Sequence, residues 1–426
     1  MLNLKRRTLS DMRESRAGMT PSYSGGPALR GVRIVDLTWV LAGPLTTQLL
    51  GQHGAEVIRV ESQTRVDVTR RSSPYAQDIP GLNRSGYFSC YNANKRSLSL
   101  NLNTSEGRNL LKRLVSTADV LVENYTPKAL KHWNLTFEDL VRTTPDLVML
   151  SLSAHGQTGP RALHPAIGYS ITGLVGMAHL TGWPDRYPLL PHAAYTDYVV
   201  PAFAVTALLA ALDYRRRTGR GFHLDISQTE IGATLVAPMT MEEPQAGQRH
   251  TRAGNCDGRY APHGAYRCQG DERWCVISVR SDKEWRSLCA VLGMRSEAED
   301  PRFATMQDRL SHRAELDERI DQETLRFNAE ALMSRLQHEG VPCGIVQSVR
   351  DLHEDPQLAY RRHYELLEHP EMGLSYYDRP GFRLSATPAV IRPAPCFAEA
   401  NEYACKELIG LSDDEIADLV AGGVLE

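Results

Sequence analysis

Short apolar segments rich in valine, isoleucine and leucine alternate with helix-type segments along the first half of the chain. Five of them are typical of buried strands. These segments are residues 32–36, 56–60, 119–122, 147–150 and 222–226. A sixth, Ser97–Leu102, alternates polar and apolar side chains with the period of two that a strand requires. Because strands separated by helices form βαβ units, the pattern predicts a parallel sheet covered by helices on both faces.

The helical segments between these strands carry recognisable start and stop signals. One helix follows Gly43-Pro44, and another begins after the cap residue Thr104, with Glu106 close behind. A long alanine-rich helix is expected over Asp197–Tyr214, ending at the turn Gly219–Gly221. Helices of this kind supply the crossover connections that parallel strands need.

The second half of the chain has a different texture and predicts a smaller α+β unit. A loop rich in glycine and arginine leads to two strand-type runs, 264–268 and 274–279, which predict a hairpin. Polar helices are expected at about 282–292 and 313–338, and a short one at 412–421. The predicted organisation is a flexible tail at 1–28, a large domain at 29–230 that resumes at 349–426, and a linker with a small domain at 231–348.

The composition is that of an ordinary globular protein, and it excludes several functional classes. With 42% hydrophobic and 23% charged residues, 426 residues are enough for more than one core. The formal net charge of −3 argues against a nucleic-acid partner, which requires a basic surface. Apolar runs fall short of the ~18 residues of a membrane-spanning helix, and the polar N-terminal residues lack the apolar core of a secretory signal. We therefore expect a cytoplasmic location and no membrane partner.

The cysteines predict neither a metal centre nor a disulfide framework. They are scattered at positions 90, 256, 268, 275, 289, 343, 396 and 405. No CxxC pair and no zinc-type spacing occurs among them. Free thiols in a reducing compartment, and no metal ligands, are the expectation.

Five motifs in a fixed order give the chain a resemblance to a known enzyme family. They are Leu29–Asp36 followed by Ala42-Gly43-Pro44, then Gly54–Glu61, Asn94–Ser97, Val122–Tyr125 and Arg217–Gly221. With these motifs the chain resembles the class III CoA-transferases, also described as the carnitine/formyl-CoA transferase-like family. The resemblance covers roughly residues 29–425. The resemblance implies a Rossmann-like large domain, a small domain, and two chains that interlock as a dimer. It also implies a coenzyme A thioester as substrate, with no separate cofactor required.

The same resemblance implies where coenzyme A is bound. By position, Val40 and Leu41 border the thioester, Leu100, Asn124 and Tyr125 line the nucleotide or pantetheine path, His132 replaces an arginine, and His155 replaces an aromatic residue near the acyl group. Some relatives carry further cations against CoA where this chain has Ser62, Asn103 and Ser153. Because such cations clamp phosphate groups, their loss together with the nucleophile predicts a weakened or absent CoA site.

Gly168 stands where the family carries its nucleophilic aspartate, the residue that holds the acyl group as a mixed anhydride. No aspartate or glutamate occurs between Arg161 and Pro184, so no carboxylate close in sequence replaces it. Asp185 follows Trp183-Pro184 in a turn and is expected to be solvated. Asp197 is expected to cap the long helix. We therefore predict no catalytic residue in this chain, with close packing or an unusual backbone angle as the reason for glycine.

Two classes of function fit this pattern. In the first, the chain is a non-catalytic scaffold for a homologous catalytic subunit in an interlocked heteromer. That complex would move CoA from succinyl-CoA to an organic acid, and an aromatic dicarboxylic acid of toluene degradation is the acceptor we expect. In the second, the chain is an independent acyl-CoA lyase, hydrolase or isomerase with a histidine base drawn from His155, His164 and His179. A sensor that only binds CoA is a third alternative.

Overall fold

The computed structural model describes residues 26–191, 194–246 and 250–426, so most of the predicted tail at 1–28 lies outside the described residues. The chain divides into two compact units, each made of segments far apart in the sequence. Unit 1 comprises the described residues up to Leu152, together with Ala204–Asp225 and Glu365–Glu426; unit 2 comprises Ser153–Phe203 and Ile226–Tyr364.

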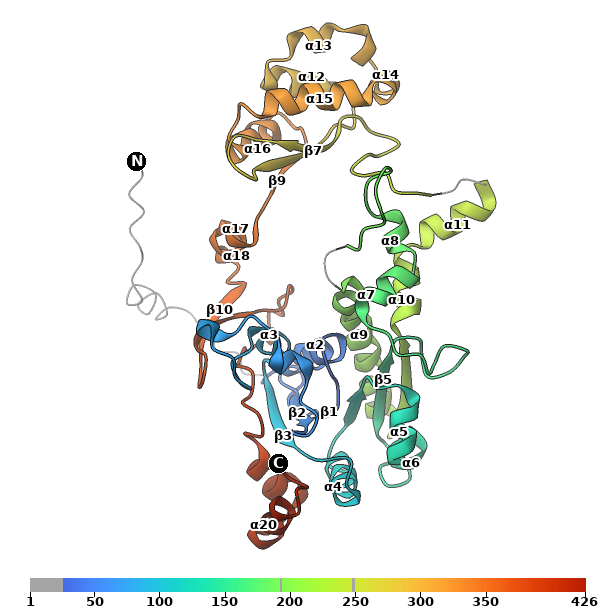
Figure 1. Cartoon of the computed structure of the whole chain (residues 1–426), viewed down its shortest axis with the longest axis vertical. Helices are drawn as coiled ribbons and strands as arrows, with labels where there is room; N and C mark the ends of the chain where they lie inside the picture. Colours follow the sequence, from blue (N-terminus) through green and yellow to red (C-terminus); the bar gives the residue numbers. More distant parts are fainter. Residues whose placement is uncertain (1–25, 192–193, 247–249) are drawn as a thin grey trace. The chain divides into compact units, whose positions relative to one another are not determined.

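A six-stranded sheet forms the centre of unit 1, in the order β3-β2-β1-β4-β5-β6 (Figure 1). The strands are β1 (Arg33–Asp36), β2 (Glu56–Glu61), β3 (Lys95–Ser99), β4 (Val120–Glu123), β5 (Val148–Ser153) and β6 (Phe222–Ser227). Parallel pairings join β3 to β2, β2 to β1, β1 to β4 and β4 to β5, which confirms the predicted parallel sheet. The strand order reverses between β1 and β4, as in doubly wound folds.

Five helices of unit 1 lie in the connections between β1 and β5, and further helices follow near the C-terminus. They are α2 (Ala42–Gln52), α3 (Gly86–Asn92), α4 (Ser105–Val115), α5 (Pro127–Trp133), α6 (Phe137–Leu140), α19 (Asn401–Tyr403) and α20 (Asp413–Ala421), with the short turns η1 (Val68–Arg71), η2 (Ala76–Asp78) and η4 (Ala404–Ile409). Thr104 caps α4 as predicted, because its hydroxyl accepts a hydrogen bond from the Gly107 amide at 3.0 Å. Leu111 of α4, Val35 of β1 and Leu425 share one buried core, so the C-terminal segment completes unit 1.

Unit 2 contains a helical cluster and a three-stranded antiparallel sheet in the order β7-β8-β9. The cluster is built from α7 (Gly168–Leu174), α8 (Met177–Leu180), the start of α9 (Tyr195–Thr218), α10 (Gln228–Leu235) and α11 (Ala237–Ala246). The sheet consists of β7 (His263–Arg267), β8 (Trp274–Ser278) and β9 (Cys343–Val346). The helices α12 (Asp282–Leu292), α13 (Arg295–Glu299), α14 (Met306–Ser311), α15 (Arg313–Thr324), α16 (Ala329–His338), α17 (Val349–Glu354) and α18 (Pro356–Tyr360) follow, with η3 (Pro301–Phe303). Beyond unit 2, a two-stranded sheet pairs β10 (Tyr364–His369) with β11 (Gly373–Asp378) in the last segment of unit 1.

Two elements of unit 2 show how well local patterns predict structure. The expected hairpin is confirmed, since β7 and β8 pair antiparallel with Ala265 opposite Val276. The helix expected over 313–338 is instead two helices, α15 and α16. Asn328 interrupts it, because its side chain accepts a hydrogen bond from the Ala331 amide at 3.0 Å and starts a new helix there.

The segment 153–203 also departs from the expected organisation. We expected it in the large domain, but α7 and the start of α9 pack with α10 in unit 2. Helix α9 is long and apolar enough to cross a membrane by length and composition alone. Val200, Ala204, Leu208 and Ala211 on this helix are fully buried, which is the pattern of a core helix.

Candidate active site

The loops that follow β1 and β4 meet where the strand order of the sheet reverses. In doubly wound folds, ligands bind outside the carboxyl ends of the strands at this point. Asn124, after β4, holds the loop after β1 through two hydrogen bonds of 2.8 Å, because its side chain accepts from the Trp39 amide and donates to the Trp39 carbonyl. Asn124 therefore fixes the backbone of the loop that carries Val40.

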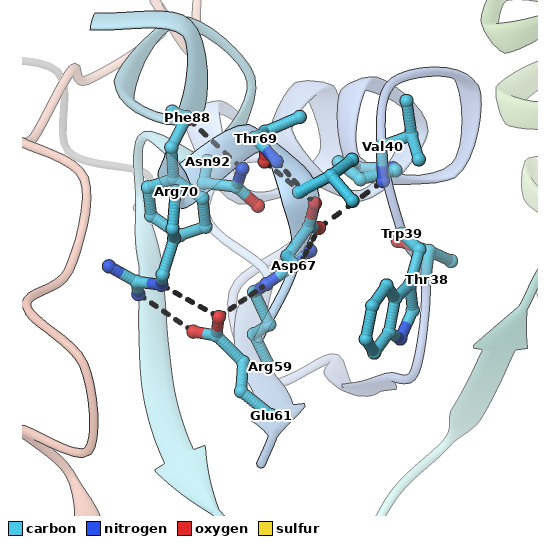
Figure 2. A network of polar contacts seen from close by, with 12 residues as sticks. Thr38, Trp39, Val40, Arg59, Glu61, Asp67, Thr69, Arg70, Phe88 and Asn92 are labelled. Atoms are coloured by element: carbon cyan, nitrogen blue, oxygen red, sulfur yellow. Dashed lines mark hydrogen bonds and ion pairs between the residues drawn. The ribbon is translucent and has the colours of Figure 1, made fainter. Parts of the chain in front are cut away.

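Val40 itself has a backbone angle, φ of +66°, that β-branched residues rarely adopt. Its amide donates a hydrogen bond of 3.2 Å to the Asp67 carboxylate, which also accepts from the amide and hydroxyl of Thr69 (Figure 2). Because a strained backbone persists only where its surroundings determine it, the Asp67 contact is part of what holds Val40 in place.

Asp67 belongs to a buried network of alternating charges under the loop (Figure 2). The Arg59 guanidinium contacts Asp67 at 2.5 Å, and Arg70 binds Glu61 through two parallel contacts of 2.7 and 2.8 Å. Burial works against ionisation of Glu61, but Arg70 and Arg59 lie close enough to hold the pKa of this carboxyl below its usual value. The Arg70 guanidinium also lies 3.6 Å from the centre of the Phe88 ring. The network thus fixes β2 and η1 beneath the candidate site.

A cavity of about 60 Å³ opens beside this loop, and its walls are largely aromatic. The rings of Trp39 and Tyr125 lie 6.4 Å apart, and those of Tyr125 and Trp133 lie 5.3 Å apart. The other lining residues are Val60, Glu61, Ser62, Thr64, Arg65, Leu100, Leu102 and Asn103. These rings are tilted or edge-to-face relative to one another, and aromatic walls suit a flat heteroaromatic group such as a nucleotide base.

The predicted CoA residues of unit 1 differ in their placement. Leu100 and Tyr125 line the cavity. Leu41 is almost fully buried at the start of α2, while Val40 is partly exposed on the loop. His132 is exposed in the last turn of α5 and is not among the lining residues. Asn124 is not among the lining residues, because its side chain is hydrogen-bonded to the backbone of Trp39 in the loop after β1.

One cation lies in the wall of the cavity at a position that the sequence analysis did not single out. Arg65 lines the cavity, with its guanidinium 5.3 Å from the centre of the Trp39 ring. Sequence reasoning missed Arg65, Trp39 and Trp133, although the aromatic residues flanking the two loops were a usable signal. The Ser62 hydroxyl donates to the Glu426 carboxylate at 2.7 Å, so this position is occupied by an internal contact.

In unit 2, Gly168 begins helix α7 and is packed too tightly for a side chain. A Cβ atom placed there would lie 2.3 Å from the Ala194 Cβ and 2.6 Å from the Asp197 Oδ2, closer than real Cβ contacts. The φ angle of Gly168 is outside the left-handed region, so close packing rather than an unusual backbone angle explains the glycine. Ile167 and Tyr169, the residues on either side of Gly168, are exposed.

Asp197 is thus brought against Gly168 by the tertiary structure, although the two residues are distant in sequence. Asp197 is the third residue of α9, and its side chain is hydrogen-bonded to Gln228 at the start of α10. Burial raises the pKa of Asp197 to about 6, although the hydrogen bond from Gln228 lowers it. We expected Asp197 to be the N-cap of the long helix. Instead it lies within the first turn of α9, and its carboxyl group is hydrogen-bonded to Gln228.

His155 lies in the same unit and is oriented by Thr229, the neighbour of Gln228. The Thr229 hydroxyl donates to the Ala154 carbonyl at 2.7 Å and lies 2.9 Å from the His155 Nδ1. Because the single hydroxyl proton is used by Ala154, His155 Nδ1 is the donor of the second bond and Nε2 carries the lone pair. Burial, followed by Arg161 and His164, lowers the pKa of His155, which favours this neutral form. His164 and His179 are exposed.

Comparisons with known proteins agree on one family. The sequence matches the model of CoA-transferase family III over residues 29–401. It is 33% identical over 398 residues to a succinyl-CoA–D-citramalate CoA-transferase of Chloroflexus aurantiacus, covering 93% of this chain and 98% of that protein. It is 32% identical over 393 residues to a succinate–glutarate CoA-transferase of Agrobacterium fabrum, covering 92% and 98%. A solved structure of a CAIB/BAIF family protein from Brucella suis superposes with a TM-score of 0.83 at 30% identity, covering 90% of this chain and all of that one.

Proposed function

Because this chain belongs to CoA-transferase family III, whose members use CoA thioesters as substrates, we propose that it is one subunit of a heteromeric CoA-transferase. The complex moves CoA from a donor such as succinyl-CoA to another organic acid. A homologous chain with a carboxylate at the position of Gly168 performs the covalent step, and this chain acts as its scaffold in an interlocked, cytoplasmic assembly.

The packing at Gly168 is the observation that carries this proposal. Acyl transfer through an anhydride requires a carboxylate that can reach the thioester carbon. Position 168 has no side chain, and the Ala194 Cβ and the Asp197 carboxyl occupy the space where one would begin. The neighbourhood is therefore adapted to glycine, which supports a division of labour between two chains rather than a site that merely lacks one group.

The two relatives described above support the substrate class. Their names give succinate and glutarate in one case and succinyl-CoA and D-citramalate in the other, all of them dicarboxylic acids or their thioesters. We propose a dicarboxylic acceptor for the complex that contains this chain. An aromatic dicarboxylic acid, as in toluene degradation, is the finer proposal, and it is tested by offering benzylsuccinate and glutarate side by side.

Co-purification from the native source, followed by labelling, tests the proposal. The complex is incubated with succinyl-CoA carrying a labelled acyl group and then treated with hydroxylamine, which converts an acyl anhydride on a carboxylate into a stable hydroxamate. We expect the main label on the homologous chain, and we expect its Asp→Asn variant to lower transfer by at least about a hundredfold. Rapid transfer by the present chain in the absence of any homologue overturns the scaffold role.

A second candidate function is favoured by the orientation of His155. Its Nε2 lone pair is available to accept a proton, as a hydrolase, lyase or isomerase acting on an acyl-CoA requires. The test is exchange of the acyl α-proton with deuterated water, or release of free CoA, by the chain and by its His155→Gln variant. Equal rates for both proteins remove this candidate.

A further inference from the structure

The carboxyl group of Asp197 lies beside the point where a side chain at position 168 would begin. From the ideal Cβ position on Gly168, the Asp197 Oδ2 is 2.6 Å away and its Cγ is 2.8 Å away. The carboxyl carbon of an aspartate at 168 would be about 1.5 Å from that same Cβ, one carbon–carbon bond away. Asp197 on α9 therefore places a carboxyl group beside the point where a side chain on the first residue of α7 would begin.

Three helices of unit 2 create this arrangement. Gly168 lets the start of α7 approach Asp197. Gly232 lets α10 approach Val175, at the end of α7, and Thr196, at the start of α9. A Cβ on Gly232 would lie 2.9 Å from the Val175 Cγ1 and 3.2 Å from the Thr196 Cγ2. Gln228, also on α10, supplies the hydrogen bond to the Asp197 side chain. The carboxyl group is thus held between α7, α9 and α10.

The state of Asp197 suits a nucleophile. Asp197 is 8% exposed, and among the described residues no Lys, Arg or His shifts its pKa or forms an ion pair with it. Burial raises the pKa of Asp197 only to about 6, which leaves the ionised form dominant at pH 7 and above. An ionised carboxylate that is poorly solvated is more reactive than one in water.

We propose that Asp197 is an acyl-accepting carboxylate of this chain, in the place left by Gly168. One carboxylate oxygen attacks the thioester carbonyl carbon, the carbon–sulfur bond breaks, and CoA leaves as the thiolate. The product is a mixed anhydride on Asp197. Water then attacks the acyl carbon, the bond to the Asp197 oxygen breaks, and the free acid and one proton are released, restoring the carboxylate. The balanced outcome is slow hydrolysis of a carboxylic acyl-CoA, an activity beyond the scaffold role.

Single-turnover acylation tests this inference. The full chain is mixed with succinyl-CoA, alone or together with its homologous subunit carrying Asn in place of the catalytic Asp, and the release of CoA is followed with a thiol reagent. We expect a burst of about one CoA per chain, and, after hydroxylamine treatment, a hydroxamate on the peptide that contains Asp197. Asp197→Asn should remove both signals, and the exposed Asp185→Asn should keep both.

A second variant separates a nucleophilic role from a structural one. Because the hydrogen bond from Gln228 lowers the pKa of Asp197, Gln228→Leu should move the pH midpoint of the burst upwards. A burst that persists in Asp197→Asn, a hydroxamate on another residue, an unmoved midpoint, or no burst in a folded chain that still binds CoA overturns the inference. The inference does not rest on the scaffold role, so failure here leaves the heteromer proposal standing, and the absence of a homologous partner leaves this inference standing.

Discussion

The carboxylate of Asp197 lies 2.6 Å from the point where a side chain on Gly168 would begin, although 29 positions separate the two residues in the sequence. Glycine at position 168 and aspartate at position 197 are therefore in direct contact and depend on each other. A change at either residue alters the space or the charge that the other one meets. The first two predictions follow from this contact.

Adding a methyl group at position 168 should destabilise unit 2. In Gly168→Ala the new Cβ would lie 2.3 Å from the Ala194 Cβ, so α7 or the start of α9 must move, at a cost of about 1–3 kcal/mol. Urea unfolding measures this loss, and Ala194→Gly in the same chain should recover part of it. Gly173→Ala is the matched control in the same helix, because nothing lies within 4 Å of its Cβ position and alanine favours helices. Equal effects at 168 and 173 contradict the packing argument.

Restoring the family aspartate in Gly168→Asp should not restore transfer. The new carboxyl group would be forced against the Asp197 carboxyl, and two carboxylates at this distance cannot both ionise without a large rise of one pKa. We expect transferase activity at the level of the unchanged chain and a protein more stable at pH 5 than at pH 7.5. Steady-state CoA exchange and urea unfolding at the two pH values check both points. Robust exchange by this variant would show that the pocket tolerates an aspartate.

Glu123 should make the stability of unit 1 depend on pH. Burial raises the pKa of this carboxyl to about 7 from an ordinary value of 4.5, although hydrogen bonds from Ser151 and the Tyr125 amide lower it. The native state then binds more protons than the unfolded chain between these pH values, so the free energy of unfolding falls as the pH rises from about 4.5 to about 7, by about 3 kcal/mol. Glu123→Gln should flatten this dependence, measured by urea unfolding across the range. The exposed Glu138→Gln serves as control and should leave the slope unchanged.

The aromatic cavity of unit 1 should bind the nucleotide end of CoA with a strength set by its cations. Asn103 lines the cavity where a relative carries a lysine, so Asn103→Lys should tighten CoA binding about three- to tenfold, and Arg65→Gln should weaken it by a similar factor. Quenching of the Trp39 and Trp133 fluorescence by CoA measures the affinity. Arg71→Gln, at an exposed site, is the control. The effects should shrink at high salt, and effects that do not depend on salt would argue against a phosphate contact.

Much of the fold could be predicted from the sequence because it follows from local patterns. The strands β1, β2, β4 and β6 fall within a residue or two of their predicted runs, and α12 spans the residues expected of it. The split between α15 and α16 escaped prediction because Asn328 acts as a cap only once the preceding helix has ended. The aromatic lining of the cavity was missed for a different reason: Trp39, Tyr125 and Trp133 come from separate loops and helices that the parallel sheet brings together.

By itself the sequence determined the parallel sheet, the antiparallel hairpin of the smaller unit, the family resemblance and the glycine at position 168, because each is written in the order and periodicity of neighbouring residues. Only the tertiary structure decided which side chains lie against that glycine. Helix α9 turns its first residues toward α7, and Asp197 therefore meets Gly168 through a contact that no local pattern encodes. Local sequence specifies elements and their faces, whereas the neighbours of a buried side chain depend on how those elements pack.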